Sequence, residues 1–112
     1  MIKMYGIPNC DTVKKAKKFL QENNIEFEFV DFKKVTPTEK EILSWKKSFG
    51  DWPVNKRGTT FRKLKDDFEA ANDKEVISLI SENLSVVKRP ILEKGGKTLC
   101  FGFDKEVFGS LV

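Results

Sequence analysis

A change of hydrophobic period within residues 1–32 strongly limits what the chain can fold into. Ile2–Tyr5 is a short apolar-rich segment, and it predicts a β-strand. Residues 11–23 carry apolar side chains at helical spacing, namely Val13, Ala16 and Leu20. Residues 25–32 then alternate apolar with acidic side chains, which is typical of a half-buried strand. A strand, a helix and a strand in so short a stretch predict one βαβ unit with parallel strands.

A capping pattern marks the start of the next predicted element. Thr36 precedes Pro37 and is followed three residues later by Glu39. This spacing places an N-cap, a proline at the first helical position and a capping-box acid together. A helix is therefore predicted from this point to about Phe49.

Helical segments continue beyond this helix. Gly50–Pro53 interrupts it, and shorter helical pieces are expected through Leu64 and again near Phe68. Asp73 is expected to cap another helix. Its apolar face is formed by Val76, Ile77 and Ile80. The sequence thus predicts a helical insertion over about residues 36–84.

The C-terminal part of the chain returns to strand patterns. Residues 86–92 are rich in apolar side chains, Gly95–Gly96 supplies a tight turn, and residues 97–101 alternate, which together predict a β-hairpin. A short closing helix is expected after an Asp104 cap. The order βαβ, helices, ββα predicts one α/β domain over residues 1–112, with a mixed sheet interrupted by the helical insertion.

Histidine is absent from the chain, and this absence excludes several classes of function. Imidazole is the usual base of serine and cysteine triads and the commonest metal ligand, so these mechanisms lack their central group. Two cysteines without histidine do not make a standard zinc site, and no metal site is predicted. In a reducing compartment two cysteines are also not expected to form a stabilising disulfide.

The charge and hydropathy of the chain point to a water-soluble protein with a mild preference for anions. The net charge is +4, and cations and anions are mixed along most of the sequence. No apolar run approaches the roughly 20 residues that span a bilayer, and no membrane association is expected. Residues 1–6 lack the pattern of a secretory leader, so a cytoplasmic location is expected. Nothing in the sequence predicts a DNA-reading helix, and direct sequence-specific DNA binding is not expected.

Cys10 is the candidate nucleophile. It stands where the loop after the first strand meets the first helix, and a helix N-terminus favours a thiolate over a thiol. The alternative is a buried and unreactive cysteine, which is common among free thiols. Val13 occupies the place of a second thiol in a C-x-x-C motif, so any redox reaction of Cys10 needs an outside thiol or Cys100 to resolve it. Cys100 lies in an alternating apolar strand and is expected to belong to the core.

Two other segments are candidates for binding. The segment 55–65 places five cations around Phe61 and could attract acidic partners, although a solvated helical face explains any single lysine there. Arg89–Pro90 enters a predicted strand, where proline requires an edge position or an unusual peptide geometry. Cis peptide bonds are almost confined to X-Pro, but only about 5–6% of such bonds in folded proteins are cis.

Four motifs together resemble the arsenate reductase family of the thioredoxin superfamily. They are most similar to its glutathione-dependent branch, which also contains the Spx-type transcription regulators. They are Pro8–Thr12, Asn55–Thr60, Lys88–Leu92 and Gly102–Phe103, in this order along nearly the whole chain. The resemblance implies a thioredoxin-like fold with a helical insertion, and it implies that Pro90 follows a cis bond and lies beside Cys10. Within this family, the chain most resembles the subgroup that carries the Asn-Cys-Asp-Thr and Lys-Arg-Gly-Thr motifs.

The resemblance also implies roles for particular residues. Cys10 matches the family's nucleophile, and Arg89 matches an arginine that holds the oxyanion. Asn9 and Thr12 flank the nucleophile in its motif and are further candidates for substrate or anion binding. No bound cofactor is implied. Glutathione is the implied co-substrate, with glutathione itself or a glutaredoxin-type thiol as the reductant.

The sequence departs from the reductases and from the Spx-type regulators at specific positions. Asn55 and Phe101 stand where the reductases carry two further arginines, and guanidinium forks are the natural clamp for arsenate. Val13 replaces the second cysteine of the Spx redox switch. Two hypotheses follow: a glutathione-dependent monothiol oxidoreductase that uses Cys10, and an Spx-like regulator or adaptor that binds RNA polymerase without redox chemistry.

Overall fold

The computed structural model describes all 112 residues and divides them into two compact units. The first unit consists of Met1–Val35 together with Arg89–Val112. The second unit is the continuous segment Thr36–Lys88. Each unit has its own helices, strands or loops.

The first unit is built on a mixed four-stranded sheet in the order β2-β1-β3-β4. The strands are β1 (Ile2–Gly6), β2 (Phe27–Asp31), β3 (Ile91–Lys94) and β4 (Lys97–Phe101). β1 pairs with β2 in parallel, and the other two pairings are antiparallel. The predicted βαβ unit and the predicted mixed sheet are therefore confirmed, and the connection from β1 to β2 runs through α1 (Asp11–Glu22).

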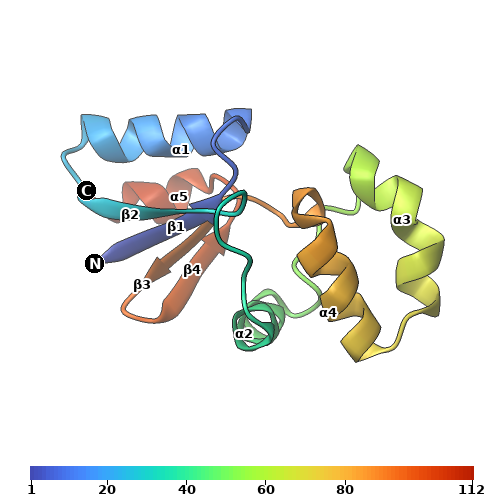
Figure 1. Cartoon of the computed structure of the whole chain (residues 1–112). Helices are drawn as coiled ribbons and strands as arrows, with labels where there is room; N and C mark the ends of the chain where they lie inside the picture. The colour runs from blue at the N-terminus through green and yellow to red at the C-terminus, as the bar shows by residue number, and fades with distance from the viewer. The chain divides into compact units, whose positions relative to one another are not determined.

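Two helices cover one face of this sheet (Figure 1). α1 directs the fully buried side chains of Val13, Ala16 and Leu20 into the core, at the helical spacing read from the sequence. α5 (Lys105–Gly109) contributes the fully buried Phe108 to the same core. Its predicted cap is confirmed, because the Asp104 carboxylate accepts hydrogen bonds from two backbone N–H groups of the first turn.

The predicted hairpin is confirmed as β3 and β4, joined by Gly95–Gly96, but its first strand begins at Ile91 and not at residue 86. Both glycines have positive φ, at 58° and 80°, which is the left-handed backbone that a two-residue hairpin turn of type I′ requires. Residues other than glycine, asparagine and aspartate rarely adopt this backbone conformation, so the turn depends on this pair of glycines. The register brings Leu92 opposite Cys100.

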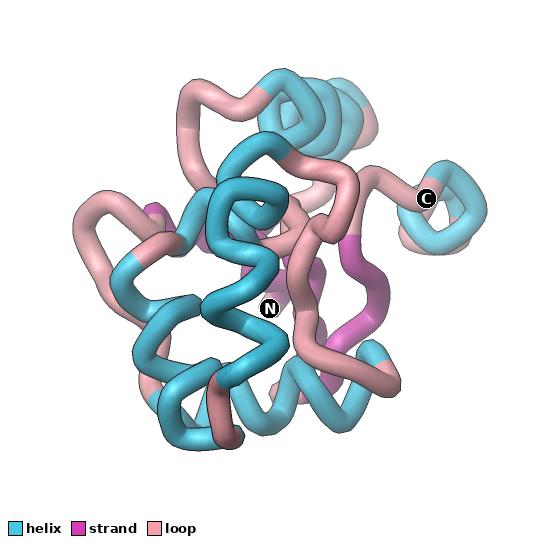
Figure 2. The backbone as a smooth tube through the Cα atoms, turned by 90° about the vertical axis from the view of Figure 1, so that its right-hand side faces the viewer, coloured by secondary structure: helices cyan, strands magenta, loops and turns pink.

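The second unit consists of helices and connecting loops (Figure 2). Its elements are α2 (Glu39–Phe49), α3 (Thr59–Ala70), α4 (Asp73–Glu82) and the short 3₁₀ helix η1 (Leu84–Val86). α3 is one continuous helix, whereas the sequence predicted two shorter pieces. The reason is a shared apolar face, because Phe61 and Phe68 lie two turns apart and their ring centroids are 5.2 Å from each other. No helix of either unit is long and apolar enough to cross a membrane.

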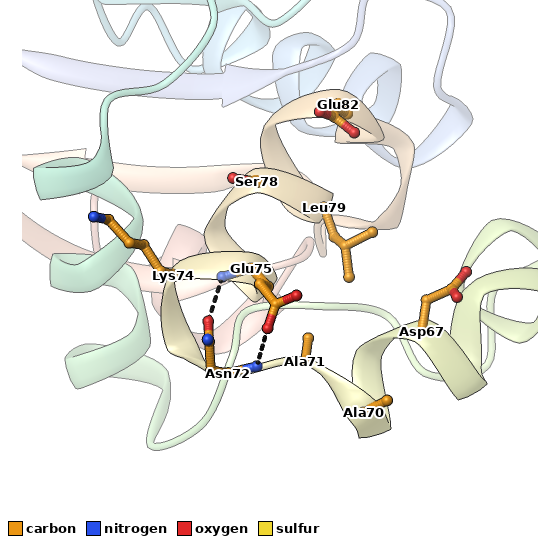
Figure 3. A pocket seen from close by; sticks show the side chains of 9 residues that line it. All are labelled: Asp67, Ala70, Ala71, Asn72, Lys74, Glu75, Ser78, Leu79 and Glu82. Carbon is orange, nitrogen blue, oxygen red and sulfur yellow. Dashed lines mark hydrogen bonds between the residues drawn. The ribbon is translucent and has the colours of Figure 1, made fainter.

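The two predicted helix caps in this unit were displaced from their true positions. Thr38, and not Thr36, caps α2: its Oγ1 accepts from the backbone N–H of Glu41 at 3.1 Å, and Glu41 Oε1 accepts from the Thr38 N–H at 2.9 Å. Asn72, and not Asp73, caps α4 through the same reciprocal box with Glu75, drawn in Figure 3. Both capping boxes satisfy two backbone donors at once, which a single cap does not.

Candidate active site

Cys10 is the N-cap residue of α1, where the sequence placed it. Its backbone is extended, with φ −83° and ψ 127°, and its carbonyl accepts the first helical hydrogen bond from the N–H of Lys14 at 2.9 Å. Its own N–H donates to the carbonyl of Ile7 at 3.2 Å, which fixes the turn that follows β1. The side chain is partly exposed and also packs against the edge of the core. The backbone of Cys10 is thus fixed by hydrogen bonds, and its side chain is only partly buried.

Gly6 is a residue of this site that the sequence reading passed over. A Cβ added at Gly6 would lie 2.8 Å from Cγ2 of Val13, closer than real side chains approach. Val13 is fully buried in the first turn of α1. The absence of a side chain at Gly6 therefore lets the end of β1 come close to the start of the helix that Cys10 caps. A glycine that ends a predicted strand just before a helix is the signal that could have indicated it.

The thiol of Cys10 is acidified by its surroundings. Burial is the largest single influence and raises the pKa of the Cys10 thiol, but the backbone N–H of Val13, the Arg89 guanidinium and the backbone N–H of Thr12 together outweigh it and leave the pKa lowered. The Cys10 side chain makes no ordinary cap hydrogen bond to the helix start. The helix N-terminus and the guanidinium thus act on the charged thiolate, which is the nucleophilic form of cysteine.

Arg89 and Pro90 stand immediately before β3. The Arg89–Pro90 peptide bond is cis, as the family resemblance implied. Pro90 is buried, and its carbonyl accepts a hydrogen bond from the N–H of Gly102 at 2.8 Å, which ties the segment to the end of β4. Arg89 is partly buried and its guanidinium acts directly on the Cys10 sulfur. Two residues from distant parts of the sequence are therefore neighbours in the folded unit.

The other candidate residues lie in different environments. Thr12 is partly buried in the first turn of α1, and its contribution to the thiolate comes from the backbone N–H. The side chain of Asn9 is exposed beside the nucleophile.

Cys100 is a core residue and not a second nucleophile of the same kind. Its side chain is only 9% exposed and belongs to the core cluster beneath α1 and α5. The thiol donates a long hydrogen bond of 3.7 Å to the carbonyl of Gly102. Burial raises the pKa of the Cys100 thiol to about 11, so it is protonated and unreactive near neutral pH. The expectation of a packed, inert Cys100 agrees with this environment.

A hollow of the helical unit does not offer comparable chemistry. It lies between α3 and α4, has a volume of about 580 Å³, and is shown in Figure 3. Its lining includes Asp67, Leu79 and Glu82 but neither cysteine. The candidate active site is therefore the Cys10 region of the first unit.

Comparison with known proteins agrees with this geometry. The family model described as the ArsC family matches residues 5–111. The chain belongs to the ArsC family. Its thioredoxin-like fold is shared with a solved structure named YFFB protein, with 36% sequence identity and a TM-score of 0.86. The match covers 98% of this chain and 97% of the YFFB chain.

Other relatives of this ArsC-family chain have different descriptions. A protein of Haemophilus influenzae described as uncharacterized is 40% identical, with 96% of each chain covered. An arsenate reductase (ArsC) related protein from Brucella melitensis is 34% identical, with a TM-score of 0.74 and coverage of 97% and 92%. The global transcriptional regulator Spx of Streptococcus agalactiae is 31% identical over 95% of this chain and 79% of its own length. The family thus includes reductase-related proteins and regulators.

Proposed function

We propose that this ArsC-family protein is a glutathione-dependent monothiol oxidoreductase whose nucleophile is Cys10. The observation that carries the proposal is the environment of that sulfur. Cys10 caps α1, is partly exposed, and has a pKa lowered by the N–H groups of the helix start and by Arg89. A purely structural cysteine does not require these features, whereas each of them favours a thiolate nucleophile.

The proposed reaction is a pair of thiol–disulfide exchanges. In the first, the Cys10 thiolate attacks one sulfur of a substrate disulfide, an S–S bond forms to Cys10, and the other substrate sulfur leaves as a thiolate. In the second, a glutathione thiolate attacks the mixed disulfide and releases Cys10 as a thiolate. The second exchange joins glutathione to the sulfur that Cys10 had taken. When the substrate is a glutathione adduct and Cys10 takes its glutathionyl sulfur, this product is glutathione disulfide. The net reaction then converts one adduct and one glutathione thiol into one substrate thiol and one glutathione disulfide.

Arg89 serves two purposes in this proposal. Its guanidinium stabilises the Cys10 thiolate before attack. It also offers hydrogen-bond donors for a carboxylate or another anionic group of the incoming substrate, in the geometry that guanidinium forks favour. Asn9 and Thr12 flank the same sulfur and are proposed to contact the substrate.

The resolving thiol is proposed to come from outside the chain. Val13 is apolar and fully buried at the position of a C-x-x-C partner. Cys100 is buried, with a pKa raised to about 11. Glutathione or a glutaredoxin-type thiol supplies the missing sulfur, and because the cytosol keeps a glutathione pool, the reaction belongs in the cytoplasm.

A disulfide or glutathione adduct suits the site better than arsenate. Arsenate is a compact multivalent oxyanion that calls for several guanidinium groups. This chain offers Arg89, whereas Asn55 and Phe101 stand at the other two positions where the reductases carry arginine. An exchange between sulfur atoms requires one thiolate and one stabilising cation, and both are present.

The proposal is tested by incubating the native protein with oxidised glutathione and mapping the adduct by mass spectrometry. We expect one glutathione per chain, on the peptide that contains Cys10, and its release by reduced glutathione. The Cys100 peptide should stay unmodified because that thiol is buried and protonated. An unmodified protein, or an adduct found on Cys100 instead, would contradict the proposal.

A second candidate function is an Spx-like regulator that docks on RNA polymerase without redox chemistry. The observation that favours it is the 31% identity to Spx over 95% of this chain, together with Val13 in place of the second thiol of the Spx switch. Purified RNA polymerase distinguishes the two functions. Stable binding that Cys10→Ser leaves unchanged would favour the regulator, and absence of binding would favour the oxidoreductase.

A further inference from the structure

The helical unit contains a basic hollow that neither cysteine lines. It has a volume of about 470 Å³. Its lining residues are Phe49, Asp51, Val54, Asn55, Lys56, Arg57 and Lys88, all of which belong to the unit Thr36–Lys88. The sequence had indicated a basic segment beginning at residue 55, but not the contribution of Lys88 from the far end of the unit.

Backbone pairing holds Lys88 next to the basic segment. Val54 and Val87 form an isolated antiparallel bridge. On either side of it, the N–H of Lys88 donates to the carbonyl of Pro53 at 2.9 Å, and the N–H of Asn55 donates to the carbonyl of Val86 at 2.7 Å. Two hydrogen-bonded chain segments therefore border the hollow, and their pairing holds the backbone of its cationic residues in place.

The charges that line the hollow do not cancel. Lys56, Arg57 and Lys88 are cationic and Asp51 is the one carboxylate, which leaves a net charge of +2. Lys56 Nζ lies 3.2 Å from Asp51 Oδ2 and is thus paired. Arg57 and Lys88 have no ion-pair partner, and Lys88 Nζ lies 5.9 Å from the centroid of the Phe49 ring. Two cations at the hollow are therefore left for a ligand.

The start of α3 adds to this positive field. The loop before it is tightened by Asn55, whose Oδ1 accepts from the N–H of Arg57 at 3.2 Å and whose carbonyl accepts from the N–H of Gly58 at 3.0 Å. Gly58 is the N-cap of α3 and supplies no side-chain cap. The first turn of α3 contains no acidic residue, so the chain itself does not neutralise the positive end of the helix.

We propose that this hollow binds a phosphate-type dianion, either as the free ion or as a phosphate monoester. Phosphate carries about −1.5 to −2 charge near neutral pH, which matches the net charge of the lining. The Arg57 guanidinium offers a planar pair of donors, while Lys56 and Lys88 offer ammonium groups from the two paired segments. All lining residues belong to the segment Thr36–Lys88, and the proposal does not use the Cys10 thiol.

An NMR titration of the full chain with inorganic phosphate tests the proposal, with chloride at matched ionic strength as the reference. We expect saturable shifts of the backbone amides of residues 55–59 with phosphate and none with chloride. Arg57→Gln and Lys88→Gln should each raise the Kd about threefold to tenfold, because each removes one unpaired cation. Asp51→Asn should lower the Kd at least about twofold, because it frees Lys56 and removes the opposing charge.

Two controls make the outcome specific. Lys63→Gln removes an exposed cation of α3 that does not line the hollow, and it should leave the Kd unchanged. Cys10→Ser should also leave the Kd unchanged, so the result does not depend on the proposed enzymatic function. A parallel titration with phosphoserine distinguishes a monoester ligand from free phosphate by which of the two binds more tightly. Equal shifts with phosphate and chloride, or Kd values unaffected by Arg57→Gln and Lys88→Gln, would overturn the proposal.

Discussion

Replacing Cys10 with serine is expected to lower the rate of glutathione-dependent disulfide reduction by at least about a thousandfold. The hydroxyl of serine does not ionise near neutral pH, so the helix start and Arg89 have no thiolate to stabilise at this position. The loss should appear in kcat and in kcat/KM together, because it removes the bond-forming atom. A coupled assay of glutathione disulfide formation measures both.

The serine variant should fold normally, which makes the loss of activity interpretable. Serine is a favoured N-cap residue and can cap α1 in place of Cys10. Cys100→Ala provides the matched control. It removes the other thiol of the chain, and it should keep full activity under conditions in which the variant is folded. Activity that survives Cys10→Ser but disappears in Cys100→Ala would reverse the assignment of the nucleophile.

Phe108→Ala is expected to reduce the free energy of unfolding by about 3–5 kcal/mol. The Phe108 side chain is fully buried, and its ring centroid lies 4.8 Å from that of Phe103 and 5.9 Å from that of Phe19. These rings join α5 to α1 over the sheet, so truncation leaves a cavity in the core that supports the Cys10 helix. Urea unfolding of the variant and the native chain measures the difference.

Two variants separate this packing effect from a general effect of substitution. Phe108→Leu retains most of the buried volume and should cost clearly less than the alanine variant. Val112→Ala alters a side chain that is 74% exposed and should change stability by less than about 0.5 kcal/mol. A Phe108→Ala variant as stable as the Val112→Ala variant would show that α5 is not an essential part of the core.

The sequence predicted those parts of the fold that depend on local pattern. The helical spacing of Val13, Ala16 and Leu20 and the Gly95–Gly96 turn specify α1 and the hairpin without help from distant residues. The exact cap residues of α2 and α4 were harder to predict. For α2, Thr36 and Thr38 both stand three residues before a glutamate, which is the spacing of a capping box. Only the folded backbone decides which threonine meets its glutamate.

The candidate site was predictable to a similar extent. The position of Cys10 at the start of a helix follows from neighbouring residues, and the structure places it there. The approach of Arg89 to that sulfur depends on how β1 and β3 pair, so only the family resemblance indicated it. The basic hollow joins Lys88 to Arg57 through a single strand-like bridge, which no periodicity in the sequence reveals.

The pH dependence of the Cys10 alkylation rate measures whether the start of α1 and Arg89 ionise its thiol. In Cys100→Ala, whose one remaining thiol is Cys10, the rate should rise with pH to a midpoint below the roughly 8.5 of an ordinary cysteine. Adding Arg89→Gln should move the midpoint upward, because the guanidinium favours the charged form. A midpoint at or above that of an ordinary cysteine, unchanged by Arg89→Gln, would contradict the account.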